Sequence, residues 1–130
     1  MGEFRTLNSG ERKVFDSGAQ RDTNAGKGRY DLLPIHAIHR LAQLYERGAI
    51  KYADRNWEKG IPVKRMFDSA LRHLFQALSG DQCEDHLAGA MWNIAGIIEY
   101  EERARLGIPG YKELFDDMGT LYEFQKGLEA

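Results

Sequence analysis

The chain has 130 residues with a formal net charge of −2, of which 42% are apolar and 29% charged. This length fits one small domain, and the charge balance gives no sign of a nucleic-acid or membrane partner. Its one cysteine, Cys83, excludes an intrachain disulfide and a zinc site made of cysteines. We expect a reduced, cytoplasmic location, since no apolar run has membrane-spanning length and no signal-peptide core precedes the domain.

The first part of the chain predicts no regular structure. Residues 1–30 are rich in glycine and lack apolar periodicity, which indicates an N-terminal arm. Residues 31–130 predict a single helical domain. Its first helix begins near Pro34, a residue suited to a first turn, and its apolar residues recur at helical spacing from Ile38 to Tyr52. Glu46 falls at the border of that apolar stripe.

Three further helices follow in the same pattern. The second spans residues 67–78, the third begins near Asp81, and the last covers about 111–127. The third helix carries an apolar stripe from Leu87 to Ile98, and its opposite face holds acids together with Gly89 and Gly96. Glycines inside a helix cost about 1 kcal/mol each, so we expect a helix or a ligand to approach that face closely. Strand signals are weak, and the sequence predicts an all-α four-helix bundle that oligomerises.

Acidic residues gather at the predicted start of the third helix. Asp81, Glu84 and Asp85 lie within five residues, and Glu46 would approach them from the first helix. Carboxylates that converge in this way repel one another unless a cation lies between them, and Mg²⁺ and Mn²⁺ prefer oxygen ligands. The pattern therefore predicts a metal site of these four acids. The alternative is that Asp81 or Glu84 only caps the helix, where the helix dipole favours negative charge.

Other polar side chains have two readings each. Lys27, Arg29, Lys51 and Arg72 are candidates for neutralising phosphates, or they are solvated surface residues. Trp57 either stacks on a base or packs in the core, and Asn93 either reads a base edge or is structural. The four histidines, His36, His39, His73 and His86, are ligand candidates or structural residues. The chain contains no P-loop, no GxGxxG, no HExxH and no His-Asp dipeptide, which excludes the site types that those motifs build.

Four segments together resemble a known family. GKGRYDLLP, YERGAIKYADRNWEKG, ALRHLFQALSGD and EDHLAGAMWNI, over roughly residues 26–102, are similar to the phage dATP/dGTP diphosphohydrolases, a MazG-like family of all-alpha nucleoside triphosphate pyrophosphohydrolases. The resemblance implies a Mg²⁺- or Mn²⁺-dependent homodimer or homotetramer. It also implies release of pyrophosphate from a purine (deoxy)nucleoside triphosphate, with dGTP foremost and GTP or dATP as further candidates. Its setting would be phage 2-aminoadenine DNA metabolism in the host cytoplasm.

The resemblance also assigns roles to residues. Glu46, Glu84 and Asp85 become the catalytic candidates, and Glu46 or Glu84 would orient or deprotonate the attacking water. The superfamily pairs an ExxE with an ExxD motif, whereas this chain has Ala49 and Gln82 at two of those positions. Two alternatives therefore stay open: a catalytically inactive nucleotide-binding or sensor module of the same fold, and a helical interaction protein whose glycine face packs a partner helix. The predicted substrate-binding residues are Lys27, Arg29, Lys51, Asn56, Trp57, Arg72, His73 and Asn93.

Overall fold

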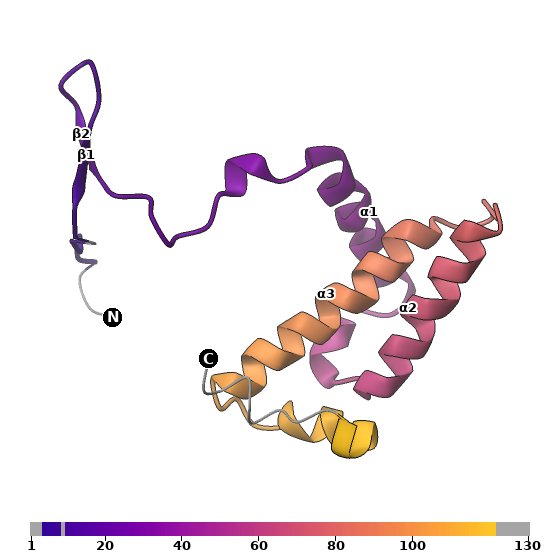
Figure 1. Cartoon of the computed structure of the whole chain (residues 1–130). Coiled ribbons are helices and arrows are strands. Elements are labelled where there is room, and N and C mark those ends of the chain that lie inside the picture. Colours follow the sequence, from indigo (N-terminus) through magenta and orange to yellow (C-terminus); the bar gives the residue numbers. More distant parts are fainter. Residues whose placement is uncertain (1–3, 9, 122–130) are drawn as a thin grey trace. The chain divides into compact units, whose positions relative to one another are not determined.

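The computed structural model describes residues 4–8 and 10–121, with the side chains of residues 120 and 121 left aside. It divides into two compact units, Met1–Leu33 and Pro34–Ala130, which are drawn together in Figure 1 and are described separately below. The catalytic role expected for residues 31–130 stays a prediction.

The first unit contains a β-hairpin, where the sequence predicted an arm without strands. Strand β1 (Arg12–Val14) pairs antiparallel with β2 (Gln20–Asp22), in a register that sets Arg12 opposite Asp22. Between them the Phe15 N–H donates to the Ala19 carbonyl at 2.8 Å, and Gly18 has a φ of +89°. A residue with positive φ suits a tight hairpin connection, which explains the glycine there. A short 3₁₀ helix, η1 (Tyr30–Leu32), follows.

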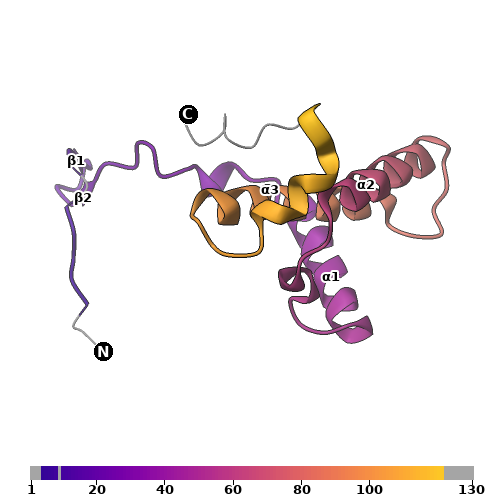
Figure 2. The same cartoon turned by 90° about the horizontal axis from the view of Figure 1, so that it is seen from below.

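The second unit is mainly helical, as predicted. Helices α2 and α3 lie side by side along their lengths (Figure 1), while α1 runs across α3 (Figure 2). The predicted fourth helix is a 3₁₀ segment that packs on α2 and α3, and residues 122–127 of that prediction lie outside the described residues. The elements are α1 (Ile35–Lys51), η2 (Asn56–Lys59), α2 (Val63–Leu78), α3 (His86–Arg105) and η3 (Lys112–Leu121).

The core of the second unit lies between α2, α3 and η3. It is formed by Val63, Met66, Ile97, Tyr100, Tyr111 and Phe115. The close approach expected at the glycines of α3 is made by α2. A Cβ at Gly89 would lie 3.0 Å from three ring atoms of His73, and one at Gly96 would overlap the Met66 Cε. Both glycines are buried because another helix occupies the space of their missing side chains.

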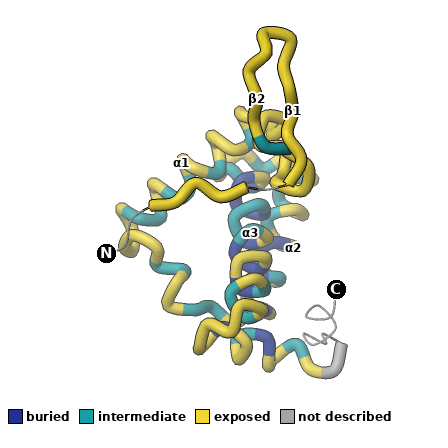
Figure 3. Tube along the Cα trace, turned by 90° about the vertical axis from the view of Figure 1, so that its left-hand side faces the viewer, coloured by how far each residue is buried: buried dark blue, intermediate teal, exposed yellow. Residues whose placement is uncertain are grey.

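The predicted orientation of α3 is wrong in one respect. Its apolar stripe was expected to be the buried face, with a helix or a ligand approaching the opposite face that carries the glycines. Figure 3 shows buried residues along α3, and these include Gly89 and Gly96 together with Ile97 from the edge of the stripe, whereas Leu87, Ile94 and Ile98 are exposed. The reason is that only the small residues let α2 approach closely. Within the part of the chain that the structure describes, no helix is long and apolar enough to cross a membrane.

Candidate functional site

A cleft of about 560 Å³ lies in the second unit. It is bordered by the C-terminal half of α1, the η2 loop, the inner face of α2 and the N-terminal half of α3. Five of the predicted substrate-binding residues line it, and so do two of the predicted catalytic acids. These seven are Lys51, Asn56, Trp57, His73, Asn93, Glu84 and Asp85.

The third helix begins later than predicted, so that none of the three neighbouring acids lies within it. Helix α3 begins at His86, and Asp85 is its N-cap, accepting a hydrogen bond from the Ala88 N–H at 3.2 Å. Asp81 and Glu84 lie in the loop before it. Capping is therefore the work of Asp85 and not of Asp81 or Glu84. The helix starts late because Asp81 accepts from the Cys83 N–H at 3.1 Å, a local bond that competes with helix formation.

Asp85 is engaged by a cation that the sequence did not single out. Arg40 of α1 binds it with two nitrogens, and the Nε–Oδ2 distance is 2.8 Å. This pairing lowers the pKa of Asp85. Together with the Ala88 N–H, three protein donors surround this carboxylate. A metal ion would therefore have to compete with Arg40 for Asp85.

Two histidines and two acids meet where α2, α3 and their connecting loop converge. His73 Nδ1 and His86 Nδ1 lie 3.0 Å apart, and His86 Nε2 lies 2.7 Å from Asp81 Oδ2. The Glu84 carboxylate reaches within 4.0 Å of His86 Nδ1. Hydrogen bonding with Cys83 and then with His86 lowers the pKa of Asp81 to about 2, so Asp81 is ionised at neutral pH.

This cluster contains a set of residues able to hold a metal ion. His73, Glu84 and His86 each offer one ligand atom, and the three atoms lie within 4.8 Å of one another. Sequence reasoning named His86 only among four ligand candidates and gave it no role. Its position directly after three acids was the available signal. Glu46, by contrast, is exposed on α1 and does not line the cleft, so its place as a metal ligand and base stays a prediction.

The remaining predicted substrate residues have mixed positions. Asn93 is buried and donates from Nδ2 to the Gly89 carbonyl at 2.8 Å. Trp57 is half-buried, packs against the core, and has the Arg103 guanidinium 4.7 Å from its ring centre. Arg72 is exposed, bonds Ser69 Oγ at 3.3 Å and does not line the cleft.

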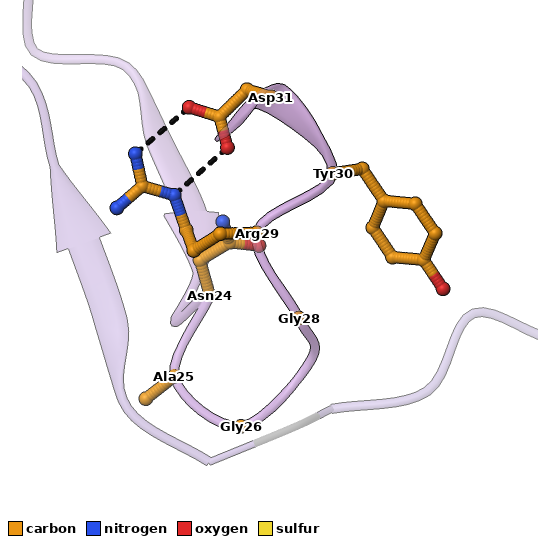
Figure 4. Close-up of a pocket in the computed structure, with 7 residues that line it drawn as sticks. All are labelled: Asn24, Ala25, Gly26, Gly28, Arg29, Tyr30 and Asp31. Atoms are coloured by element: carbon orange, nitrogen blue, oxygen red, sulfur yellow. Dashed lines mark hydrogen bonds and ion pairs between the residues drawn. The ribbon is translucent and has the colours of Figure 1, made fainter. Parts of the chain in front are cut away.

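Two predicted phosphate binders belong to the other unit. Arg29 forms two 2.8 Å hydrogen bonds to Asp31, beside a hollow lined by residues 24–26 and 28–31 (Figure 4). The charge of Arg29 is thus already paired. Lys27, which precedes it closely in the sequence, is exposed. Cations that sequence reasoning missed do line the cleft of the second unit: Arg47, Arg55 and Arg65.

The fold and the cleft define a class: a mainly helical protein with a cleft lined by cations and by side chains able to hold a metal ion. A family model described as dATP/dGTP diphosphohydrolase, N-terminal, matches residues 17–107, and the chain belongs to this family. The match confirms the family resemblance and places the chain among hydrolases. Searches of curated proteins and of solved structures returned no match.

Proposed function

We propose that the protein is a metal-dependent nucleoside triphosphate pyrophosphohydrolase. It cleaves the bond between the α and β phosphates of dGTP or GTP, with dATP a further candidate, and releases the monophosphate and pyrophosphate. The observation that carries this proposal is a single cleft, within a chain of the diphosphohydrolase family, lined by four cations and by Glu84, Asp85 and His73.

The cleft suits a nucleotide in size and charge. Its volume of about 560 Å³ falls among those of small-molecule sites. Arg47, Lys51, Arg55 and Arg65 offer positive charge to a triphosphate, and arginines can bind phosphate oxygens in pairs. Trp57 offers an aromatic surface to the base. Asn93 has one amide proton committed to Gly89, which leaves its other polar groups for a base edge.

The donor set fits a divalent metal ion, because carboxylate and imidazole groups of Glu84, His73 and His86 converge at the cleft. Mg²⁺ or Mn²⁺ is the proposed cofactor, with Glu46, Asp81, Glu84 and Asp85 as the acids to supply it. When bound, the ion would stabilise the charge of the leaving pyrophosphate and lower the pKa of a water. Glu84, exposed beside the cleft, would orient that water and accept its proton.

A homo-oligomer, a dimer or a tetramer, is part of the proposal. Helix α2 exposes Leu71, Leu74, Phe75 and Leu78, while α3 exposes Leu87, Ile94 and Ile98. Two apolar stripes on one helical hairpin have no partner among the described residues, and patches of this kind mark protein contacts. A second copy is the occupant, since two such hairpins would form a four-helix assembly by burying identical surfaces. The glycine face of α3 cannot make this contact with a second copy, because α2 covers it.

The proposed setting is purine nucleotide metabolism of a phage that makes 2-aminoadenine DNA, in the host cytoplasm.

One alternative function is that of a protein with the same fold but without catalytic activity. The Arg40–Asp85 pair and the residues Ala49 and Gln82 favour it, because they remove acids that the superfamily uses. In that case the protein would bind a purine nucleotide and act as a sensor.

These functions can be separated by incubating the protein with each of the eight common ribo- and deoxynucleoside triphosphates, in the presence of Mg²⁺ or Mn²⁺, and by identifying the products. We expect turnover of dGTP to equal amounts of dGMP and pyrophosphate. A product of dGDP and phosphate would contradict the proposal. Tight binding of dGTP without turnover would replace it with the sensor function.

A further inference from the structure

We infer that His73, His86 and Glu84 form a first-row transition-metal site in which Asp81 orients His86. This inference deepens the proposed function, because it names the metal ligands and the metal class. It differs from the acid-only set of Glu46, Asp81, Glu84 and Asp85. Its ligands come from α2, from the first residue of α3 and from the loop between the two helices.

The spacing of the ligand atoms carries the inference. His73 Nδ1 and His86 Nδ1 are 3.0 Å apart, and the Glu84 oxygen lies 4.0 Å from His86 Nδ1. A first-row ion binds nitrogen and oxygen ligands at about 2.0–2.2 Å, so neighbouring ligand atoms are about 3 Å apart. The two nitrogens already have this separation. Only a small movement of the exposed Glu84 side chain is needed to complete the set.

Asp81 contacts Nε2 of His86, the ring nitrogen that would not bind the metal, as carboxylates beside metal-ligating histidines do. His86 Nε2 lies 2.7 Å from Asp81 Oδ2, and Asp81 Oδ1 accepts from the Cys83 N–H. The short contact between Nε2 and Oδ2 favours the ring proton on Nε2, which leaves the lone pair of His86 Nδ1 facing His73. Ligating histidines usually donate their other N–H to such a partner. Because His86 is only 3% exposed, its ring has little freedom to turn away.

Gly89 leaves room for the His73 ring because it has no side chain. Three atoms of this ring lie 3.0 Å from the position of a Gly89 Cβ, so the ring rests on the bare backbone of α3. Both His73 and Glu84 line the cleft. Glu84 has a side chain that is 69% exposed. The metal would thus be open on the cleft side, where water and phosphate oxygens can complete its coordination.

The donor types select the metal. Imidazole nitrogen suits ions such as Co²⁺, Ni²⁺ and Zn²⁺, whereas Mg²⁺ favours an all-oxygen octahedron. The rival interpretation is a hydrogen bond between the two Nδ1 atoms, with a proton in place of the ion. That arrangement needs no contribution from Glu84. The two interpretations differ in whether the metal-free protein takes up a transition metal without nucleotide.

The test is titration of the whole, chelator-treated chain with Co²⁺ and, separately, Mg²⁺, without nucleotide, followed by the visible spectrum of Co²⁺ and by calorimetry. We expect Co²⁺ to bind at least 10-fold more tightly than Mg²⁺. His73→Gln and Glu84→Gln should each weaken Co²⁺ binding at least 10-fold, and Asp81→Asn should weaken it 10- to 100-fold. His39→Gln and Glu102→Gln, at exposed positions, should leave Co²⁺ binding unchanged. Circular dichroism establishes that each variant is folded.

Several results would overturn the inference: no Co²⁺ uptake by the wild type, equal affinity for Mg²⁺, or undiminished Co²⁺ binding in both His73→Gln and Glu84→Gln. These outcomes are independent of turnover. A protein that binds Co²⁺ through these residues but does not hydrolyse dGTP keeps the site and loses the proposed function. A protein that hydrolyses dGTP with Mg²⁺ but does not take up Co²⁺ keeps the proposed function and loses the site.

Discussion

Arg40 on α1 and Asp85 at the start of α3 bind each other through two hydrogen bonds, although 45 residues separate them in the sequence. This pair joins α1 to the end of the cleft where the acids and histidines gather. It also occupies the carboxylate that the sequence predicted as a metal ligand. Asp85 therefore has two identified structural tasks, the N-cap of α3 and the contact with α1.

Variants of this pair separate the cap from the ion pair. Asp85→Asn keeps a capping oxygen but loses the charge, and Asp85→Ala loses both. We expect the alanine variant to be less stable than the asparagine variant by about 1 kcal/mol in urea unfolding. Arg40→Gln should cost less than Asp85→Ala, because solvent screens the ion pair of the half-exposed Arg40 side chain. Equal stability of the two Asp85 variants would contradict the capping role.

Activity in the same variants tests the predicted catalytic role of Asp85. We expect Asp85→Asn to abolish turnover of dGTP while the far-ultraviolet circular dichroism stays that of the wild type. Arg40→Gln serves as the control, since it breaks the same ion pair but leaves the carboxylate present. If Asp85→Asn and Arg40→Gln keep equal, near-normal rates, Asp85 has only a structural role.

Glycines on α1 and α3 offer a matched pair of substitutions. Gly89→Ala should destabilise the protein by about 1–3 kcal/mol, because the new methyl group meets the His73 ring at 3.0 Å. Gly48→Ala, whose methyl group would meet no atom within 4 Å, should stabilise it by about 0.5–1 kcal/mol. Thermal unfolding measures both. A stabilised Gly89→Ala protein would show that His73 does not rest on the α3 backbone.

Tyr100 holds the η2 loop that carries Asn56 and Trp57. Its hydroxyl donates to the Trp57 carbonyl at 2.6 Å and accepts from the Ile61 N–H at 3.1 Å. Tyr100→Phe should cost about 1–3 kcal/mol, since the Ile61 N–H loses its partner and the Trp57 carbonyl keeps only the Gly60 N–H. It should also raise KM for dGTP more than it lowers kcat, because the loop borders the cleft.

An exposed tyrosine provides the control for Tyr100. Tyr52→Phe removes a hydroxyl from a residue that is 65% exposed. Unfolding of this variant in urea should match that of the wild type. If Tyr100→Phe also matches the wild type in stability and in KM, the loop is held by other contacts.

The apolar stripe of α2 predicts the effect of added charge on assembly. Phe75 and Leu78 are 68% and 84% exposed in the single chain. Phe75→Glu combined with Leu78→Glu should lower the mass measured by light scattering from an oligomer to one chain. Lys64→Glu, at an exposed polar position on the same helix, should leave the mass unchanged. A wild type that is monomeric at micromolar concentration would refute this role of the stripe.

The sequence predicted the helices better than their orientations. Apolar spacing located α1, α2 and most of α3, because helical periodicity depends only on local geometry. It could not tell which face of α3 turns inward. One face is apolar, the other is made of small residues, and the choice depends on how closely α2 can approach Gly89 and Gly96.

The candidate site was also predicted only in part, because the sequence indicates residue types but not the contacts that packing creates. Glu84, Asp85, His73 and Trp57 were singled out by residue type and by the family resemblance, and they line the cleft, while their roles stay predictions. Asp81 was placed on a helix because its bond to the Cys83 N–H has no periodic signature. Arg40 and His86 were missed as partners, since contacts across helices depend on packing. The hairpin of the first unit was missed because its two strands of three residues carry no alternating apolar pattern.

The central claim, hydrolysis at the α phosphorus of a purine nucleoside triphosphate, can be tested directly with ¹⁸O-labelled water. The wild type would be incubated with dGTP and Mn²⁺, and the products would be weighed by mass spectrometry, with Glu84→Gln as the impaired control. Attack at the α phosphorus places one ¹⁸O in dGMP and none in pyrophosphate, and this is the result we predict. Label in pyrophosphate or in free phosphate, or no turnover of dGTP, would contradict the account.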